Sequence, residues 1–400
     1  MTERQEEKLK QYKERFLSEL KDKVIPFWLE NGPDREYGGI LHCLDADGSP
    51  FSLDKGVWMQ GRAGWMFSYM YNNIEKNEEY LRAAASCIDF ARDRCFLDDG
   101  RMSLTVGQDG EVVSEQGDGW FSEAFYISAC AEYYRATGDR EYLAASRDCY
   151  DSILERFRVS TATPCEENEQ VKRRRTRAFA QPMILINVTN TLRECDPDRA
   201  EYYNGAADML IPAIKAHHSE EYRATLEAIA LDGSIILSSA NSRITTPGHV
   251  IECVWFLLDE ATKRGDGELI SFAEVMFNEA FDIGYDRKYG GILYNRDIFG
   301  GSVEAYEQDM KIWWVHNEAI ISSLYLFLVT GKDRYFEIFE EMMDYSFSHF
   351  RHSDTGEWYS SLHRDGTPGA PDILGFLYKG PFHVPRMHAK CYLLLDKYGI

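Results

Sequence analysis

The strongest constraint on the fold of this chain is a polar residue that recurs at the start of predicted apolar helices. These residues follow one another at intervals of 61, 58, 68, 67 and 67, and they are Arg62, Glu123, Gln181, His249, His316 and His383. Between them stand helices richer in Glu, Lys and Arg, which are typical of an outer layer facing solvent. Repeats of this length that each hold two helices indicate a closed or open helical array. Six of them predict an all-α (α/α)6 barrel, with the six polar residues converging at one mouth.

Two kinds of connection alternate along the predicted repeats. Inner helices pass to outer ones through short glycine turns such as Thr137-Gly138-Asp139. Outer helices pass to inner ones through longer segments with Asp-Gly pairs at 47–48, 109–110 and 365–366, which favour β-hairpins. The hairpins are therefore expected around the rim of the mouth. No linker or low-complexity segment interrupts the pattern, so residues 1–400 are expected to form a single domain.

The charge balance and the cysteines limit the possible partners and location. Lys and Arg number 44 and Asp and Glu 66, which gives a formal net charge of −22. Such an acidic chain is not expected to bind nucleic acid or an anionic membrane surface. The first residues, 1–7, lack the apolar stretch of a signal peptide, and no apolar run is long enough to span a bilayer. The nine cysteines are scattered without a Cys-x-x-Cys pair, which favours reduced thiols and a cytoplasmic location.

The segment Thr246-Pro247-Gly248-His249-Val250-Ile251-Glu252 carries the clearest chemical pattern. It is typical of a helix start, with Thr245 or Thr246 as the cap and Pro247 at the first helical position. His249 and Glu252 are three residues apart and are expected to share one face. The positive end of the helix dipole disfavours an imidazolium and favours a nearby anion. The pattern predicts a neutral histidine suited to removing a proton next to a carbonyl group.

Two other uses of the same polar residues stay open at this point. A metal site could be assembled from the histidines and carboxylates, but there is no cysteine partner, and a histidine base can remove a proton next to a carbonyl without a metal. We therefore expect no metal. Paired carboxylates could instead serve a glycosidase. The residues concerned are His249, Glu252, His316, Glu318 and His383 for the metal, and Glu123, Glu252 and Glu318 for the glycosidase.

Several segments together resemble the N-acylglucosamine 2-epimerase family. They span nearly the whole chain, in the order in which the family has them. The segments are Trp58-Met59-Gln60-Gly61-Arg62, Phe121-Ser122-Glu123, Pro182-Met183, Pro247-Gly248-His249, Lys311-Ile312-Trp313-Trp314 and Phe382-His383-Val384-Pro385-Arg386. The resemblance implies an (α/α)6 barrel, in agreement with the helix pattern. It also implies an isomerase that interconverts N-acylglucosamine and N-acylmannosamine through a cis-enediolate.

The resemblance also implies roles for individual residues. His249 and His383 match the two catalytic histidines of the family. The residues expected to hold or line the sugar are Arg62, Glu252, Trp255, Trp314, His316 and Glu318. His316 and Glu318 are two positions apart and do not share a helix face, so one of the two is able to pack instead of binding.

Other expectations from the resemblance concern specificity and regulation. Disaccharide epimerases of the family carry a histidine and a glutamate on the third inner helix, where this chain has 182–187, Pro-Met-Ile-Leu-Ile-Asn. This difference favours an N-acylhexosamine over a disaccharide as the substrate. Aldose–ketose isomerisation and a protease-binding role remain alternative functions. A homodimer is expected. No cofactor is expected to be required, although the basic run 172–177 could bind ATP as an activator.

Overall fold

The computed structural model describes residues 1–117, 119–161, 175–303 and 305–400 of the chain. Twelve long helices alternate between two concentric layers in this part of the chain. The inner ones are α3 (Val57–Asn73), α5 (Phe121–Thr137), α8 (Ala180–Cys195), α10 (Pro247–Arg264), α12 (Trp313–Thr330) and α14 (His383–Lys397). The outer ones are α1 (Glu3–Glu19), α4 (Glu78–Arg94), α6 (Arg140–Thr161), α9 (Ala200–Lys215), α11 (Gly267–Gly284) and α13 (Asp333–His349).

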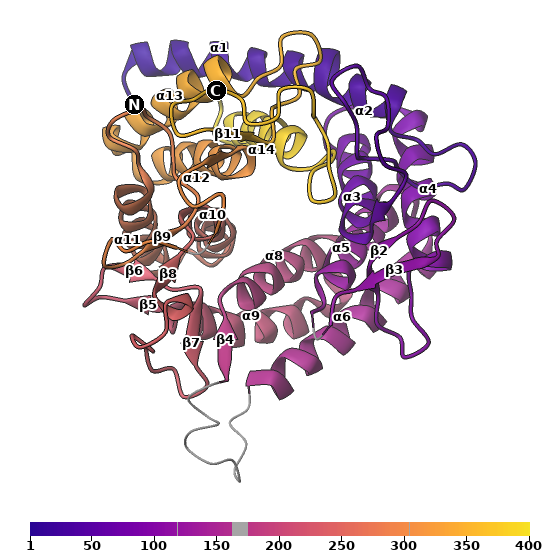
Figure 1. Cartoon of the computed structure of the whole chain (residues 1–400), viewed down its shortest axis with the longest axis horizontal. Helices are drawn as coiled ribbons and strands as arrows, with labels where there is room; N and C mark the ends of the chain where they lie inside the picture. The colour runs from indigo at the N-terminus through magenta and orange to yellow at the C-terminus, as the bar shows by residue number, and fades with distance from the viewer. Residues whose placement is uncertain (118, 162–174, 304) are drawn as a thin grey trace.

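The inner helices close into a ring. Each packs against the next along the chain, and α14 returns to contact α3 (Figure 1). Helix α1 covers α14, so the two ends of the chain lie on the same side of the ring. The inner helices are buried nearly all round, as Trp255, Phe256 and Leu257 of α10 illustrate. The predicted (α/α)6 barrel is therefore confirmed.

Two predicted helix boundaries differ from the structure. An apolar stripe of Leu9, Tyr12, Phe16 and Leu20 predicts one helix over 3–29, but the structure has α1, a π turn (Leu20–Val24) and α2 (Ile25–Asn31). The change falls just before Pro26, which has no backbone N–H to continue the helical pattern. Helix α3 begins at Val57, so Arg62 lies in its second turn and does not open it.

Short strands surround the mouth, as predicted, but not every Asp-Gly pair forms a hairpin. Residues 109–110 turn between β2 (Ser103–Val106) and β3 (Val112–Glu115), and β2 also pairs with β1 (Lys55–Gly56). Around residues 47–48 only an isolated bridge forms, between Leu44 and Pro50. The other described pairs are β4 (Thr176–Ala178) with β7 (Ala228–Ala230), β5 (His218–Ser219) with β6 (Ala224–Thr225), β8 (Ile244–Thr245) with β9 (Arg296–Asp297), and β10 (Lys311–Ile312) with β11 (Ser361–Leu362).

A buried lysine precedes three of the inner helices and ties the preceding loop to the barrel. Each ammonium meets a buried carboxylate from the turn that follows an outer helix. The pairs are Lys55 with Asp34 at 2.6 Å, Lys311 with Asp286 at 3.5 Å, and Lys379 with Glu357 at 2.7 Å. Because a buried charge is costly without its partner, these pairs hold the segments before α3, α12 and α14 against the barrel.

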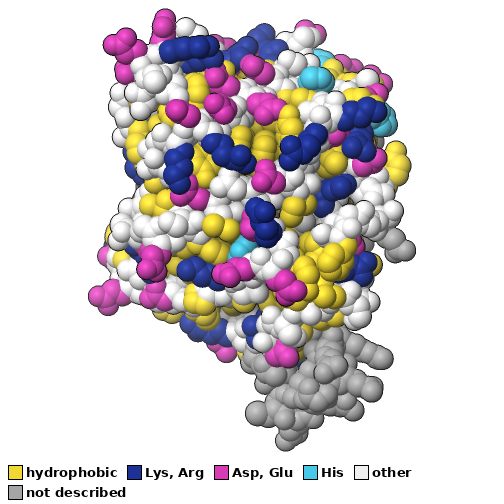
Figure 2. All heavy atoms as spheres, turned by 90° about the vertical axis from the view of Figure 1, so that its left-hand side faces the viewer, with side chains coloured by type: hydrophobic (Ala, Val, Ile, Leu, Met, Phe, Trp, Pro, Cys, Tyr) yellow, Lys and Arg dark blue, Asp and Glu magenta, His cyan; other side chains and the backbone are white. Residues whose placement is uncertain are grey.

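The outer surface carries charges of both signs. On the face in Figure 2, basic and acidic side chains are interspersed among apolar ones. Ion pairs of this kind join α11 to α13, for example Arg334 with Asp282 at 3.2 Å. Among the described residues, no helix combines the length and the apolar character needed to cross a membrane.

Candidate active site

A cavity of about 910 Å³ opens at the mouth of the barrel, at the N-terminal ends of inner helices. Five of the residues singled out from the sequence line it: Arg62, His249, Glu252, Trp314 and His383. Its rim carries exposed aromatic side chains, including Tyr306 and Tyr378. Most of the remaining lining is apolar, which is typical of a site where a few polar groups orient a ligand.

The two histidines reach the cavity from different helices and share one aromatic neighbour. His249 is the third residue of α10, and His383 is the first residue of α14. The ring of Trp314 stacks on His249 with centroids 5.1 Å apart, and it lies 5.8 Å from the ring of His383. The cavity therefore holds two imidazoles arranged around one tryptophan.

Gly248 makes this arrangement possible. A Cβ atom at this position would lie 2.6 Å from Val315 and 2.7 Å from the ring of Trp314. The missing side chain lets α10 approach α12 closely, and Trp314 then reaches the His249 ring. Thr246, one of the two predicted caps, is the N-cap residue of α10, but its side chain makes no capping bond to the helix. Its hydroxyl donates instead to Oδ1 of Asn295 at 2.9 Å.

His249 is bonded to a carboxylate that the sequence analysis missed. Its Nδ1 lies 3.0 Å from Oε1 of Glu227. Burial alone would lower the pKa of His249, but the charge and hydrogen bond of Glu227 raise it above its usual value. The charge of Glu227 therefore opposes the predicted neutral state of His249, because a carboxylate at hydrogen-bond distance favours the protonated ring against the helix dipole.

His383 has the opposite electrostatic environment. Its Nδ1 lies 2.8 Å from Oε1 of Glu318 and 3.2 Å from Nη2 of Arg386. Burial, and then the positive charges of Arg386 and Arg62, hold the pKa of His383 well below its usual value. A neutral His383 that donates Nδ1–H to Glu318 has an unprotonated Nε2, which is a base.

Arg386 occupies the centre of a buried acidic cluster. Ligand atoms of Glu252, Glu318 and His383 lie within 4.8 Å of one another, close enough to suggest a metal site. Nη2 of Arg386 already contacts all three, at 2.5 Å from Glu252, 2.7 Å from Glu318 and 3.2 Å from His383. The guanidinium thus supplies the positive charge that a metal would bring, and these side chains fit an arginine-centred network better than a metal site.

Arg62 is a buried cation that is free to bind a ligand. Its guanidinium packs 4.2 Å from the ring of Phe125 and 4.8 Å from that of Phe382. Within the described residues it has no hydrogen bond or ion pair, and its Nε is buried without a partner. Burial lowers the pKa of Arg62 to about 9, so the group still carries its charge at neutral pH. Its position on the cavity wall makes it a site for an oxyanion or a polar oxygen.

Three of the residues predicted to contact the sugar, Trp255, His316 and Glu318, do not line this cavity, so their sugar contacts stay predictions. His316 is fully buried; Nδ1 lies 2.9 Å from the carbonyl of Ile312, and Nε2 accepts the backbone N–H of Ile292 at 3.0 Å. Glu318 lies behind His383 and accepts the indole N–H of Trp255 at 2.7 Å. These residues support the site from within the core.

The convergence of six polar residues at the mouth is correct only in part. Glu123 is buried and accepts hydrogen bonds from Met102, Gln116 and Arg156. Gln181 lines a separate small cavity with Pro182. With Glu123 and Glu318 outside the main cavity, the carboxylate set of the glycosidase alternative is not assembled. Part of the basic run, 172–174, lies outside the described residues, so its nucleotide site stays a prediction.

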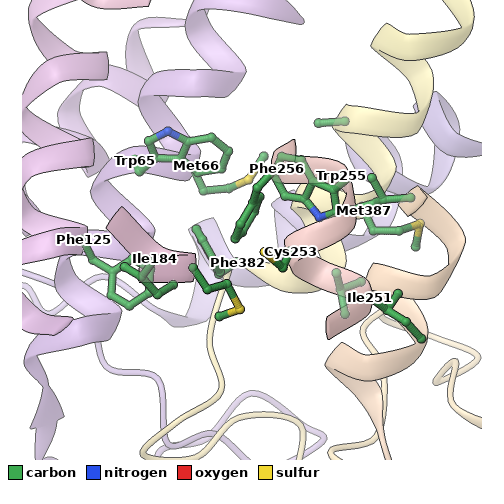
Figure 3. Packing of buried hydrophobic residues seen from close by; sticks show 14 of the residues in the cluster. Trp65, Met66, Phe125, Ile184, Ile251, Cys253, Trp255, Phe256, Phe382 and Met387 are labelled. Carbon is green, nitrogen blue, oxygen red and sulfur yellow. The ribbon is translucent and has the colours of Figure 1, made fainter. Parts of the chain in front are cut away.

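Below the cavity, aromatic rings from several inner helices close the barrel. Phe382 packs against Trp65 and Phe125, with ring centroids 5.5 and 5.6 Å apart. Figure 3 shows these rings together with Trp255 and Ile184, which come from other inner helices. This packing forms a floor that fixes His383, since it immediately follows Phe382.

The chain is similar to known sugar epimerases over nearly its whole length. Residues 39–375 match the family model for N-acylglucosamine 2-epimerase. The chain is 33% identical over 408 residues to the N-acylglucosamine 2-epimerase of Bos taurus, covering 98% of this chain and 93% of that one. It is 24% identical to the cellobiose 2-epimerase of Ruminococcus albus, covering 92% of this chain and 95% of that one.

The fold also matches solved structures. The cellobiose 2-epimerase of Bacillus thermoamylovorans superposes with a TM-score of 0.81 at 21% identity, covering 96% of this chain and 99% of that one. The family model covers most of the sequence, and the relatives align over nearly their whole length. The chain therefore belongs to the N-acylglucosamine 2-epimerase family.

Proposed function

We propose that this chain is a sugar 2-epimerase that interconverts N-acylglucosamine and N-acylmannosamine. One observation carries the proposal: a single cavity holds two histidines whose proton affinities are shifted in opposite directions. A reaction that removes a proton from one face of a carbon and returns one to the other face needs a base and an acid together.

The chemistry follows from the two environments. Neutral His383 takes the C2 proton of the open-chain sugar, and the C–H electron pair forms the C1–C2 double bond as the carbonyl oxygen becomes negative. Arg62 stabilises this enediolate oxygen. Protonated His249 then delivers a proton to C2 from the opposite face. In the reverse direction the two histidines exchange roles.

The wall formed by α8 supports an N-acylated monosaccharide as substrate. Ala180, Met183 and Ile184 face the cavity from this helix. These side chains offer an apolar surface for the acyl group and no hydrogen-bond partner for a second sugar ring. The family relationship to N-acylglucosamine 2-epimerases supports the same substrate.

The test uses His249→Asn and His383→Asn with N-acetylmannosamine in deuterium oxide, followed by NMR. Each variant is expected to lose epimerisation by roughly 10²–10⁴-fold, because one acid–base group is missing. Each variant retains one base, so deuterium is expected to enter C2, without inversion, of the epimer whose C2 proton faces that base. Because this epimer differs between the two variants, each variant is also incubated with N-acetylglucosamine. His363→Asn, an exposed histidine outside the cavity, serves as the control.

Near-normal epimerisation by either site variant contradicts the two-base proposal. Formation of a ketose in the same spectra identifies an aldose–ketose isomerase instead.

The proposal also covers the oligomeric state and the cellular compartment of the protein. We expect a homodimer in a reducing compartment such as the cytoplasm, supported by family resemblance and by eight described cysteines that are free thiols. Light scattering checks the dimer. An ATP titration of turnover checks whether a nucleotide acts as an activator.

A further inference from the structure

Glu227 stands at a junction between two inner helices. Its backbone carbonyl accepts the N–H of Phe179 at 2.9 Å, and Phe179 immediately precedes α8. Its backbone N–H donates to the carbonyl of Ile244 at 2.9 Å, in the strand that leads to α10. The backbone of Glu227 is therefore fixed relative to the beginnings of both helices.

The side chain of Glu227 is aimed at His249. Its Oε1 lies 3.0 Å from Nδ1 of His249, and the two side chains are only 21% and 28% exposed. Burial would raise the pKa of Glu227, but His249 and the hydroxyl of Thr246 lower it, so the group is a carboxylate. A carboxylate at Nδ1 requires a proton there, and it directs Nε2 of His249 away from itself.

The two histidine–glutamate pairs of the site differ in one respect. Glu318, which holds His383, also binds the guanidinium of Arg386 at 2.7 Å, so its charge is shared. The groups that face Glu227 are His249, Thr246, His217 and Tyr294. Burial lowers the pKa of His217 to about 4, so it is neutral. With His217 neutral, His249 is the group in this set that can pair with the charge of Glu227, and the charge of Glu252 on α10 also raises the pKa of His249.

We propose that Glu227 is a positioning residue that fixes the tautomer and orientation of His249 and makes it the member of the histidine pair that holds the proton at rest. This inference rests on the proposed epimerase function. It also explains why one barrel places two chemically identical side chains in unequal roles: the difference comes from the counter-charge behind each ring.

The experiment compares Glu227→Gln with wild type by NMR titration of the histidine Cε1 protons, with the His249 signal assigned through His249→Asn. The pKa of His249 is expected to fall by roughly one to three units when the carboxylate charge is removed. Glu220→Gln, an exposed carboxylate in the β5–β6 turn, is the control and is expected to leave this titration unchanged. Glu227→Asp keeps the charge and is expected to retain most of the raised pKa.

Kinetics supply a second measurement. Since His249 must be protonated to act as donor, the alkaline limb of the kcat/KM profile is expected to move to lower pH in Glu227→Gln. Both reaction directions must lose the same factor, because their kcat/KM ratio equals the equilibrium constant.

An unchanged His249 titration in folded Glu227→Gln overturns the inference, whatever happens to turnover. A shifted titration together with epimerisation that survives in His249→Asn overturns the proposed function and leaves the pair as a structural feature.

Discussion

Replacing Arg386 by Met tests the central charge network of the site. Arg386 is 2% exposed and is held between two buried carboxylates, Glu252 at 2.5 Å and Glu318 at 2.7 Å. Met fills much of the same volume but has no charge. The substitution leaves both carboxylates in the core without their shared cation, and it removes one of the charges that keep His383 neutral.

The size of the effect follows from the burial. Removing one partner of a buried ion pair costs about 3–5 kcal/mol, because the remaining charge stays out of water. At the same time the pKa of His383 is expected to rise. The positive charge of Arg386, which lowers this pKa, is gone, while the negative charges of Glu318 and Glu252, which raise it, remain. His383 must be unprotonated to act as base, so the acid limb of the kcat/KM profile moves to higher pH.

Urea unfolding measures the free energy of unfolding, and the pH dependence of epimerisation reports the pKa of the base, His383. The double variant Arg386→Met with Glu318→Gln is expected to be more stable than the single variant, because one unpaired charge has been removed. Arg334→Met is the control: Arg334 pairs with Asp282 on the outer surface and the two side chains are 52% and 47% exposed, so its loss should cost about 1 kcal/mol or less. Wild-type stability and an unshifted acid limb in Arg386→Met would refute the reasoning.

Two further substitutions test which residues support the structure of the site and which are needed for the reaction. His316→Phe removes the acceptor for the Ile292 N–H and the donor to the Ile312 carbonyl. The free energy of unfolding should fall by about 1–3 kcal/mol, while KM for N-acetylmannosamine stays unchanged. A raised KM in the folded variant would contradict a purely structural role. Gly248→Ala places a methyl group against Val315 and Trp314, so the variant should lose about 1–3 kcal/mol of stability and its epimerisation activity. An active variant of normal thermal stability would show that this close approach is not needed.

The architecture could be predicted from the sequence because it depends on repetition. Helix pairs at nearly constant intervals, with glycine turns on one side, allow few arrangements other than a ring. The same repetition did not show which face of each helix looks into the cavity. His249 and His316 have similar positions in successive repeats, yet only His249 lines the cavity; His316 faces the outer layer and stacks on Tyr345 of α13 with centroids 5.5 Å apart.

Glu227 and Arg386 show a second limit to what the sequence pattern can predict. Glu227 lies in a short irregular segment, 22 residues before its partner, and only pairing of that segment with its neighbours brings it to His249. Arg386 was seen in the sequence as part of a motif, but its role depends on three side chains from three helices. Periodicity carries no information about contacts of this kind.

The active-site cavity has two walls that differ in how freely they can evolve, and the close approach at Gly248 belongs to one of them. On one side, α10, α12 and α14 are locked together by the close approach at Gly248 and by the arginine that joins their carboxylates. On the other side, α8 contributes only small and apolar side chains, Ala180, Met183 and Ile184, which take no part in that network. A new substrate preference can therefore arise by exchanging side chains on α8 while the proton-transfer apparatus stays intact, and directed evolution of this barrel should begin there.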